Sequence, residues 1–159
     1  MKRIVVVILT GLFVTTSASV VAAQSESTPQ GSIRIVQLLE ETGLNYEKRT
    51  PTTWMVRFKA DGGDDIPVVL AQADTILVLV AIAATGAETR ESVELYRELL
   101  KFNLDADYIK AGLDDDGDFQ IRSDVKLASL TGPMLKEFLD QLATGVNQLR
   151  PLFAKHRKR

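Results

Sequence analysis

The segment LDDDGDFQIR, from Leu113 to Arg122, places four aspartates around one glycine, and this composition is typical of a calcium-binding loop. The twelve-residue calcium loop needs glycine at its sixth position and a bidentate carboxylate at its twelfth. With Gly117 in the sixth position, Gly112 takes the first position and Ser123 takes the twelfth, and neither side chain is a carboxylate. The other ligand positions fall on Asp114, Asp116 and Asp118. The segment therefore lacks two essential ligands of a calcium loop.

The same segment fits the tip of a β-hairpin. Its apolar residues alternate on both sides of the turn: Ile109, Ala111 and Leu113 before it, and Phe119, Ile121 and Val125 after it. Facing residues of a hairpin share one side of the sheet, so Leu113 is predicted to face Phe119. That register leaves residues 115–117 as a three-residue loop with Gly117 in the left-handed conformation. The aspartates are then turn formers, and weak binding of calcium or a small ligand by Asp114 to Asp118 stays an alternative.

Other residues that could perform chemistry are few. The chain has no cysteine, and its one histidine, His156, lies in a basic segment at the C-terminus. Histidine-based triads, cysteine nucleophiles and zinc sites are therefore excluded or implausible. The acidic residues cluster in turns or on polar helical faces, and no glycine-rich phosphate loop opens a helix. We expect no enzyme, no catalytic, cofactor-binding or metal-binding residues and no cofactor.

The N-terminal residues are typical of an export signal. Lys2 and Arg3 precede an apolar stretch from Ile4 to Val14, and small residues follow up to Ala23. We predict a signal peptide over residues 1–23 and a polar linker over 24–30, with an uncleaved membrane anchor as the alternative. A protein exported without disulfides points to the bacterial periplasm, so we expect a periplasmic or secreted location.

The rest of the chain carries 17 basic and 21 acidic residues, and a formal charge of −4 does not suggest nucleic-acid binding. Residues 151–159 are predicted to form a basic C-terminal tail, because Pro151 ends the preceding helical pattern and KHRKR follows it. Such a tail is usually solvated and disordered, and it is the only segment for which we consider contact with anionic lipid or an acidic partner.

The periodicity of residues 31–150 predicts a single α+β domain with the order α-β-β-β-α-β-β-α, that is, three helices and an antiparallel five-stranded sheet. The predicted helices are residues 31–42, 87–103 and a last one that opens at 131–133 and ends before Pro151. The predicted strands are residues 54–58, 66–71 and 75–82, followed by the two strands of the hairpin. A capping box at Thr85 to Glu88 is assigned to the start of the second helix.

The strand at residues 75–82 is apolar on both faces, and such strands are normally buried on both sides. Helices two and three can cover one face of the sheet, so the other face must meet helix one, a ligand or a second subunit. We expect part of the sheet or of helix two to form a homodimer contact. Trp54 and Tyr96 could line a groove, but we expect both in the core.

Four segments resemble the YbjN family, a bacterial family assigned to sensory-transduction regulation that shares the fold of type III secretion chaperones. They are residues 95–103 (LYRELLKFN), 108–114 (YIKAGLD), 116–121 (DGDFQI) and 130–135 (LTGPML), and residues 54–63 are similar as well. The resemblance covers residues 32–149. It implies the same order of elements, no catalytic residues and a tendency to bind proteins or to self-associate.

We therefore expect an exported, non-catalytic, chaperone-like or regulatory module that binds an unidentified protein and forms a homodimer. The alternative is a sensor that responds to calcium or a small ligand through Asp114 to Asp118. The export signal argues against a delivery chaperone of the cytoplasmic kind.

Overall fold

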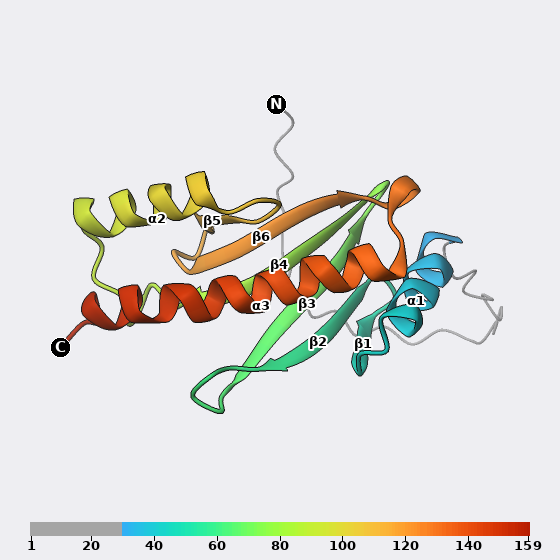
Figure 1. The fold of residues 1–159 in the computed structure, drawn as a ribbon, viewed down its shortest axis with the longest axis horizontal. Coiled ribbons are helices and arrows are strands. Elements are labelled where there is room, and N and C mark those ends of the chain that lie inside the picture. The colour runs from blue at the N-terminus through green and yellow to red at the C-terminus, as the bar shows by residue number, and fades with distance from the viewer. Residues whose placement is uncertain (1–29) are drawn as a thin grey trace, which may run out of the picture.

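The computed structural model describes residues 30–159 of the chain (Figure 1). The elements are α1 (Gln30–Thr42), β1 (Tyr46–Thr50), β2 (Thr53–Lys59), β3 (Asp65–Ala73), β4 (Ile76–Ala84), α2 (Val93–Asp105), β5 (Lys110–Leu113), β6 (Phe119–Lys126), the 3-10 helix η1 (Leu127–Ser129) and α3 (Gly132–Lys155). The predicted signal peptide, residues 1–23, lies outside the described residues. So does the predicted linker as far as Gln30, where α1 begins.

The sheet is antiparallel and has six strands, in the order β1-β2-β3-β4-β6-β5. The prediction of five strands is wrong because it missed β1, whose sequence YEKRT shows no apolar alternation. Among the strands of residues 30–159, this one pairs only with β2, and four of its five residues are exposed. Charged side chains are common on edge strands because they discourage pairing with other chains. A strand of this kind has almost no signal in the sequence.

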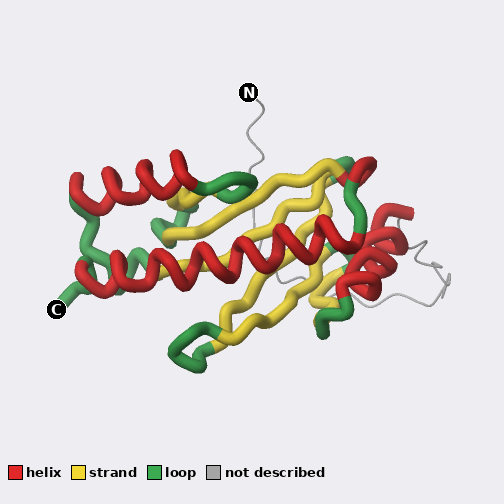
Figure 2. The backbone as a smooth tube through the Cα atoms, viewed as in Figure 1, coloured by secondary structure: helices red, strands yellow, loops and turns green. Residues whose placement is uncertain are grey.

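The core lies between one face of the sheet and two helices. Alternate residues of the central strands point into it, and β4 contributes Leu77, Leu79 and Ala81. Figures 1 and 2 show α3 crossing this face while α1 lies at one end of it, and the two helices pack together. Helix one therefore shares a face of the sheet with helix three. Of the three alternatives for the opposite face, helix one is therefore the wrong one, and a ligand or a second subunit remain.

The predicted hairpin is confirmed. Leu113 faces Phe119 and Ala111 faces Ile121, so the apolar sets share one side of the sheet. The amide of Asp114 donates to the carbonyl of Asp118 at 3.0 Å, and these two residues close the loop. Gly117 has a φ of 82°, the left-handed conformation that a three-residue hairpin loop requires.

Helix α2 begins six residues later than predicted. Its N-cap is Ser92, whose hydroxyl accepts a hydrogen bond from the amide of Leu95 at 3.1 Å. The Thr85 to Glu88 sequence forms a turn instead, in which the carbonyl of Thr85 accepts from the amides of Glu88 and Thr89. Thr85 and Ser92 are both residue types that cap helices. Helix α2 starts after Ser92 because the apolar residues that follow it, Leu95 and Leu99, pack into the core.

Helix α3 continues past Pro151 to Lys155, so the predicted end at Pro151 is wrong. A proline inside a helix removes one hydrogen bond to the preceding turn, yet it does not end a helix whose next residues pack into a core. Phe153 supplies that packing here, since it is buried and its ring centroid lies 5.2 Å from that of Phe119. The residues after it are therefore held against the domain.

Candidate protein-binding surfaces

The acidic turn uses its carboxylates on the backbone. The Asp114 carboxylate accepts from the amides of Asp116 and Asp118, at 3.1 and 2.8 Å. The Asp118 carboxylate accepts from the amide of Gly86, at 2.8 Å, and so ties the hairpin to the loop that leads into α2. No group of acidic or histidine side chains in residues 30–159 is arranged to hold a metal ion. Two of the four aspartates thus shape the fold, and nothing in this geometry supports the sensor alternative.

The one histidine lies beside a serine, an arrangement that the sequence alone did not suggest. His156 Nδ1 is 3.2 Å from Ser92 Oγ, and the His156 side chain is buried. The same Ser92 oxygen is already the N-cap of α2. A cap hydroxyl that is held by a backbone amide serves the helix, so we assign this pair to structure.

The outward side of α2 is apolar. The α2 stripe consists of Val93, Tyr96, Leu100 and Leu104, whose exposed fractions are 75%, 37%, 69% and 85%. At about 100° per residue the stripe is centred roughly 120° from the direction of Leu95 and Leu99, the buried residues of the helix, and Tyr96 lies at the edge of the stripe nearest to them. The helix thus has a second apolar side, and within residues 30–159 only the side with Leu95 and Leu99 packs into the core. The expectation that Tyr96 lies in the core is wrong, whereas Trp54 is fully buried.

Tyr96 adds a polar group at the edge of the α2 stripe. Its hydroxyl donates a hydrogen bond to the carboxylate of Glu91, in the loop before the helix. This hydrogen bond, with partial desolvation and the negative charge of Glu91, raises the pKa of Tyr96 above its ordinary value. The Tyr96 hydroxyl and Glu91 therefore form a polar edge beside the apolar stripe.

A second apolar surface lies on the side of the sheet away from α1 and α3. The open-face patch consists of Val69, Val78, Val80 and Ile82, which alternate with the core residues of β3 and β4. Val69 and Val80 are direct cross-strand partners. All four are partly or largely exposed. The expectation that β4 is buried on both faces is therefore wrong for residues 30–159 of one chain.

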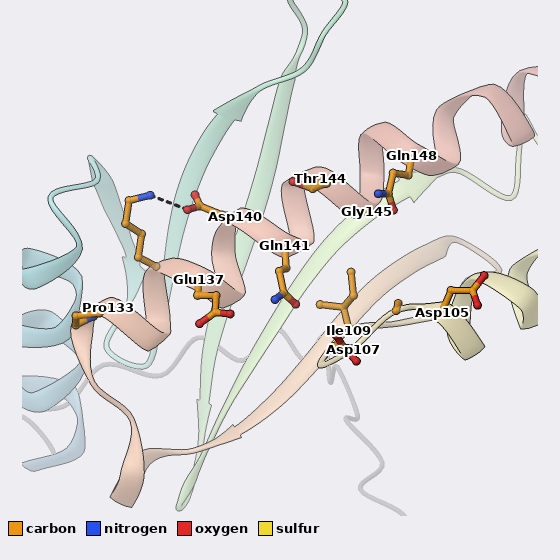
Figure 3. A pocket seen from close by; sticks show the side chains of 12 residues that line it. Asp105, Asp107, Ile109, Pro133, Glu137, Asp140, Gln141, Thr144, Gly145 and Gln148 are labelled. Carbon is orange, nitrogen blue, oxygen red and sulfur yellow. Dashed lines mark hydrogen bonds and ion pairs between the residues drawn. The ribbon is translucent and has the colours of Figure 1, made fainter.

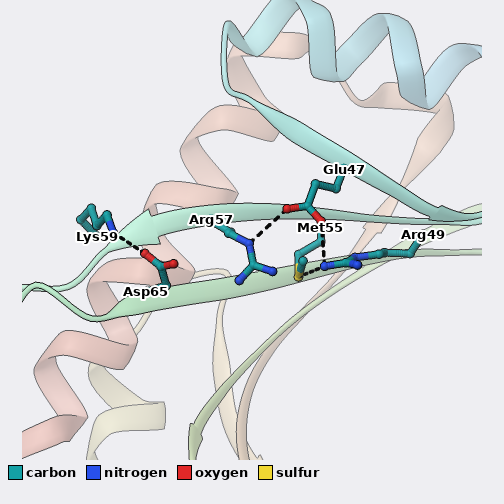
Figure 4. Close-up of polar contacts among 6 residues, drawn as sticks. All are labelled: Glu47, Arg49, Met55, Arg57, Lys59 and Asp65. Atoms are coloured by element: carbon teal, nitrogen blue, oxygen red, sulfur yellow. Dashed lines mark hydrogen bonds and ion pairs between the residues drawn. The ribbon is translucent and has the colours of Figure 1, made fainter.

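Charged side chains flank this patch on the β1 and β2 side. Glu47 pairs with Arg49 at 2.7 Å and with Arg57 at 3.2 Å, and Lys59 pairs with Asp65 at 2.6 Å (Figure 4). The hydrogen bond from Lys59 and its positive charge lower the pKa of Asp65. Exposed pairs of this kind add little stability, so their main effect is to surround the apolar patch with a polar border.

A pocket with a volume of about 520 Å³ lies between α3 and the segment that joins α2 to β5 (Figure 3). Its rim is acidic: Asp105, Asp107, Glu137 and Asp140. One rim carboxylate is already neutralised, because Lys136 pairs with Asp140 at 2.6 Å. The pocket is a charged depression beside the helix, and these carboxylates do not form a metal-binding group.

The chain belongs to the Tir chaperone protein (CesT) family, whose model matches residues 36–150. No curated protein sequence matches the chain significantly. No helix within residues 30–159 has both the length and the apolar character needed to cross a membrane.

Solved structures support the same assignment at the level of the fold. One chain of the heterodimeric ExoU–SpcU complex from the type III secretion system of Pseudomonas aeruginosa is 17% identical, with a TM-score of 0.56, and the match covers 75% of this chain and 97% of that one. YbjN from E. coli is 16% identical, with a TM-score of 0.57 and coverage of 79% and 93%. A chain of the Yersinia pestis complex of the type III secretion chaperone SycH with a fragment of YscM2 is 22% identical, with a TM-score of 0.53 and coverage of 75% and 98%.

These matches confirm the resemblance to YbjN and to type III secretion chaperones. They make this a chaperone-like protein-binding fold and favour a non-enzymatic role. The expected periplasmic or secreted location is wrong, because CesT-type secretion chaperones are cytoplasmic.

Proposed function

We propose that this protein is a non-catalytic, chaperone-like module that works as a homodimer and binds a protein partner. The observation that carries the proposal is the α2 stripe, because it exposes most of Val93, Leu100 and Leu104, and part of Tyr96, on a side of α2 away from its packed residues. Large exposed apolar patches on soluble domains mark interaction sites. Most soluble oligomers are symmetric dimers in which the same surface of two copies meets. A second α2 stripe is the simplest cover for the first.

The partner-binding surface that we propose is the open-face patch. Its four apolar side chains are partly or largely exposed on the side of the sheet away from α1 and α3. Exposed apolar patches of this kind mark interaction sites. Several structural neighbours are complexes with protein partners, among them the HopA1–SchA chaperone–effector complex, and this favours the same class of ligand.

Two substitutions separate the two parts of the proposal. Leu100→Asp places a charge on the α2 stripe, and we expect sedimentation velocity to show a dimer for the unchanged protein and a monomer for this variant. Val80→Asp places a charge on the open-face patch, and we expect the variant to stay dimeric and to lose a partner that the unchanged protein captures. A monomer at every concentration of the unchanged protein contradicts the dimer. Equal capture by the Val80→Asp variant contradicts the partner surface.

A further inference from the structure

The C-terminal segment is built into the fold. The tail segment, residues 156–159, lies along the β4–α2 loop, which we define as residues 85–92. The amide of Arg90 donates to the carbonyl of His156 at 2.7 Å, and the amide of Lys158 donates to the carbonyl of Glu88 at 2.8 Å. Thr89 and Arg157 pair between these two bonds as an antiparallel bridge. The expectation of a disordered tail is therefore wrong, whereas Arg157, Lys158 and Arg159 are exposed as expected.

Side chains of the tail segment reach both ends of the β4–α2 loop. At the helical end, His156 lies against Ser92, the N-cap of α2, and His156 and Thr89 are 5% and 3% exposed. At the other end, Lys158 Nζ donates to the carbonyl of Gly86 at 2.7 Å. The tail segment thus contacts the loop at its start, along its backbone and at the first residue of the helix cap.

Gly86 is held from two sides. Its amide donates to the Asp118 carboxylate of the acidic hairpin, and its carbonyl accepts from Lys158 of the tail segment. A Cβ atom at this position would lie 2.2 Å from the carbonyl oxygen of Gly117, so only glycine fits without a backbone shift. The acidic turn and the basic tail, the two charged features of the sequence, therefore meet at one residue of this loop.

We propose that the tail segment is a latch that holds the N-terminal end of α2 against the end of α3 and so fixes the direction of the α2 stripe. The rest of α2 is attached by Leu95, Leu99 and the half-buried Phe102 and, at its far end, by Asn103, whose side chain pairs with the backbone of Ala111. Because few side chains hold this helix, the bonds at its N-terminal end limit how far it can tilt. The effect of the latch on the pairing of two copies rests on the proposed dimer, whereas the latch itself does not.

The test compares three variants of the full chain. Truncation after Lys155 leaves α3 whole and removes every tail contact described above. Lys158→Pro removes the amide that binds Glu88 and the amine that binds Gly86, and it lies too near the end of the chain to disturb the core. Arg157→Ala/Arg159→Ala is the matched control, since it removes two positive charges but leaves the backbone bonds of His156 and Lys158 in place.

Hydrogen exchange and sedimentation are the measurements. We expect truncation and Lys158→Pro to speed amide exchange of residues 86–95 on the order of tenfold, with β3 and β4 unchanged, and to weaken the dimer. The Arg157→Ala/Arg159→Ala control should neither speed amide exchange nor weaken the dimer. Unchanged exchange in both latch variants overturns the proposal, and so does equal acceleration in the control, which would assign the effect to charge. If the unchanged protein is a monomer, the proposed dimer fails and the exchange of residues 86–95 alone decides the latch.

Discussion

Helices α2 and α3 use their apolar residues in opposite ways. Helix α3 has nine buried residues in 24, and its apolar seam lies against the sheet. Helix α2 has two buried residues in 13 and leaves Val93, Leu100, Leu104 and part of Tyr96 exposed along a separate stripe. Both are amphipathic by periodicity, so periodicity alone does not reveal which apolar side a chain keeps for itself. The difference identifies α3 as the support of the fold and α2 as the element with an unpaired surface.

The largest expected effect is on the α3 side of this comparison. Leu142 is fully buried, so Leu142→Ala should lower the free energy of unfolding by about 3 kcal/mol, through lost burial and the cavity that remains. Urea denaturation at a fixed protein concentration measures this change. Leu100→Ala on α2 is the matched control, and in the monomer it should change the same quantity by less than about 0.5 kcal/mol. Similar losses in the two variants would remove the distinction between the helices.

The next effect is on association. Leu100→Asp should raise the dimer dissociation constant by about 100-fold or more, because a symmetric interface loses two buried leucines and gains two charges. Sedimentation equilibrium over a range of concentrations measures the constant. Ile33→Asp is the control, since Ile33 is an apolar residue of α1 that is 52% exposed outside the stripe. Equal weakening by Ile33→Asp would show that the loss is not specific to α2.

A smaller effect is expected where α2 meets the edge of the sheet. Asn103 Oδ1 accepts from the amide of Ala111 at 2.6 Å, and its Nδ2 donates to the carbonyl of the same residue at 3.0 Å. Asn103→Ala should lower the free energy of unfolding by about 1 kcal/mol, since both bonds are lost. Asn103→Asp keeps only the acceptor, so its free energy of unfolding in urea denaturation should lie between those of the unchanged protein and Asn103→Ala. No change in either variant would mean that Asn103 does not anchor α2.

The smallest expected effect is that of calcium. The carboxylates of Asp114 and Asp118 already accept backbone amides, so added calcium should not change the melting temperature. Asp116→Ala should behave as the unchanged protein does in the same titration. A large calcium-dependent rise that Asp116→Ala abolishes would restore the sensor alternative and weaken the case for α2 as the functional surface.

Local patterns predicted the parts of this fold that local physics determines. The hairpin register follows from the parity of Leu113 and Phe119, and the cap of α3 follows from Thr131 ahead of Pro133. The missed elements depend on tertiary contacts: β1 has no apolar face, and α3 continues past Pro151 because Phe153 packs in the core.

The candidate surfaces were only partly predictable. The sequence indicated that helix two or the sheet forms a contact between copies, but it placed Tyr96 in the core. In a helix with apolar residues on both sides, spacing cannot say which side meets the sheet. The tail contacts were not predictable, because Ser92 and His156 are far apart in the sequence and lie together only once α2 and α3 have packed.

Disulfide crosslinking tests the central claim most directly, because the chain contains no cysteine. Single cysteines are placed at Val93, Leu100 and Leu104 of the α2 stripe, and at Ile33 as the control. If two stripes meet about a twofold axis, the position nearest the axis should form a covalent dimer under mild oxidation, while Ile33→Cys stays monomeric on a non-reducing gel. Failure of all three stripe positions to crosslink, or crosslinking of Ile33→Cys to the same extent, would contradict the account.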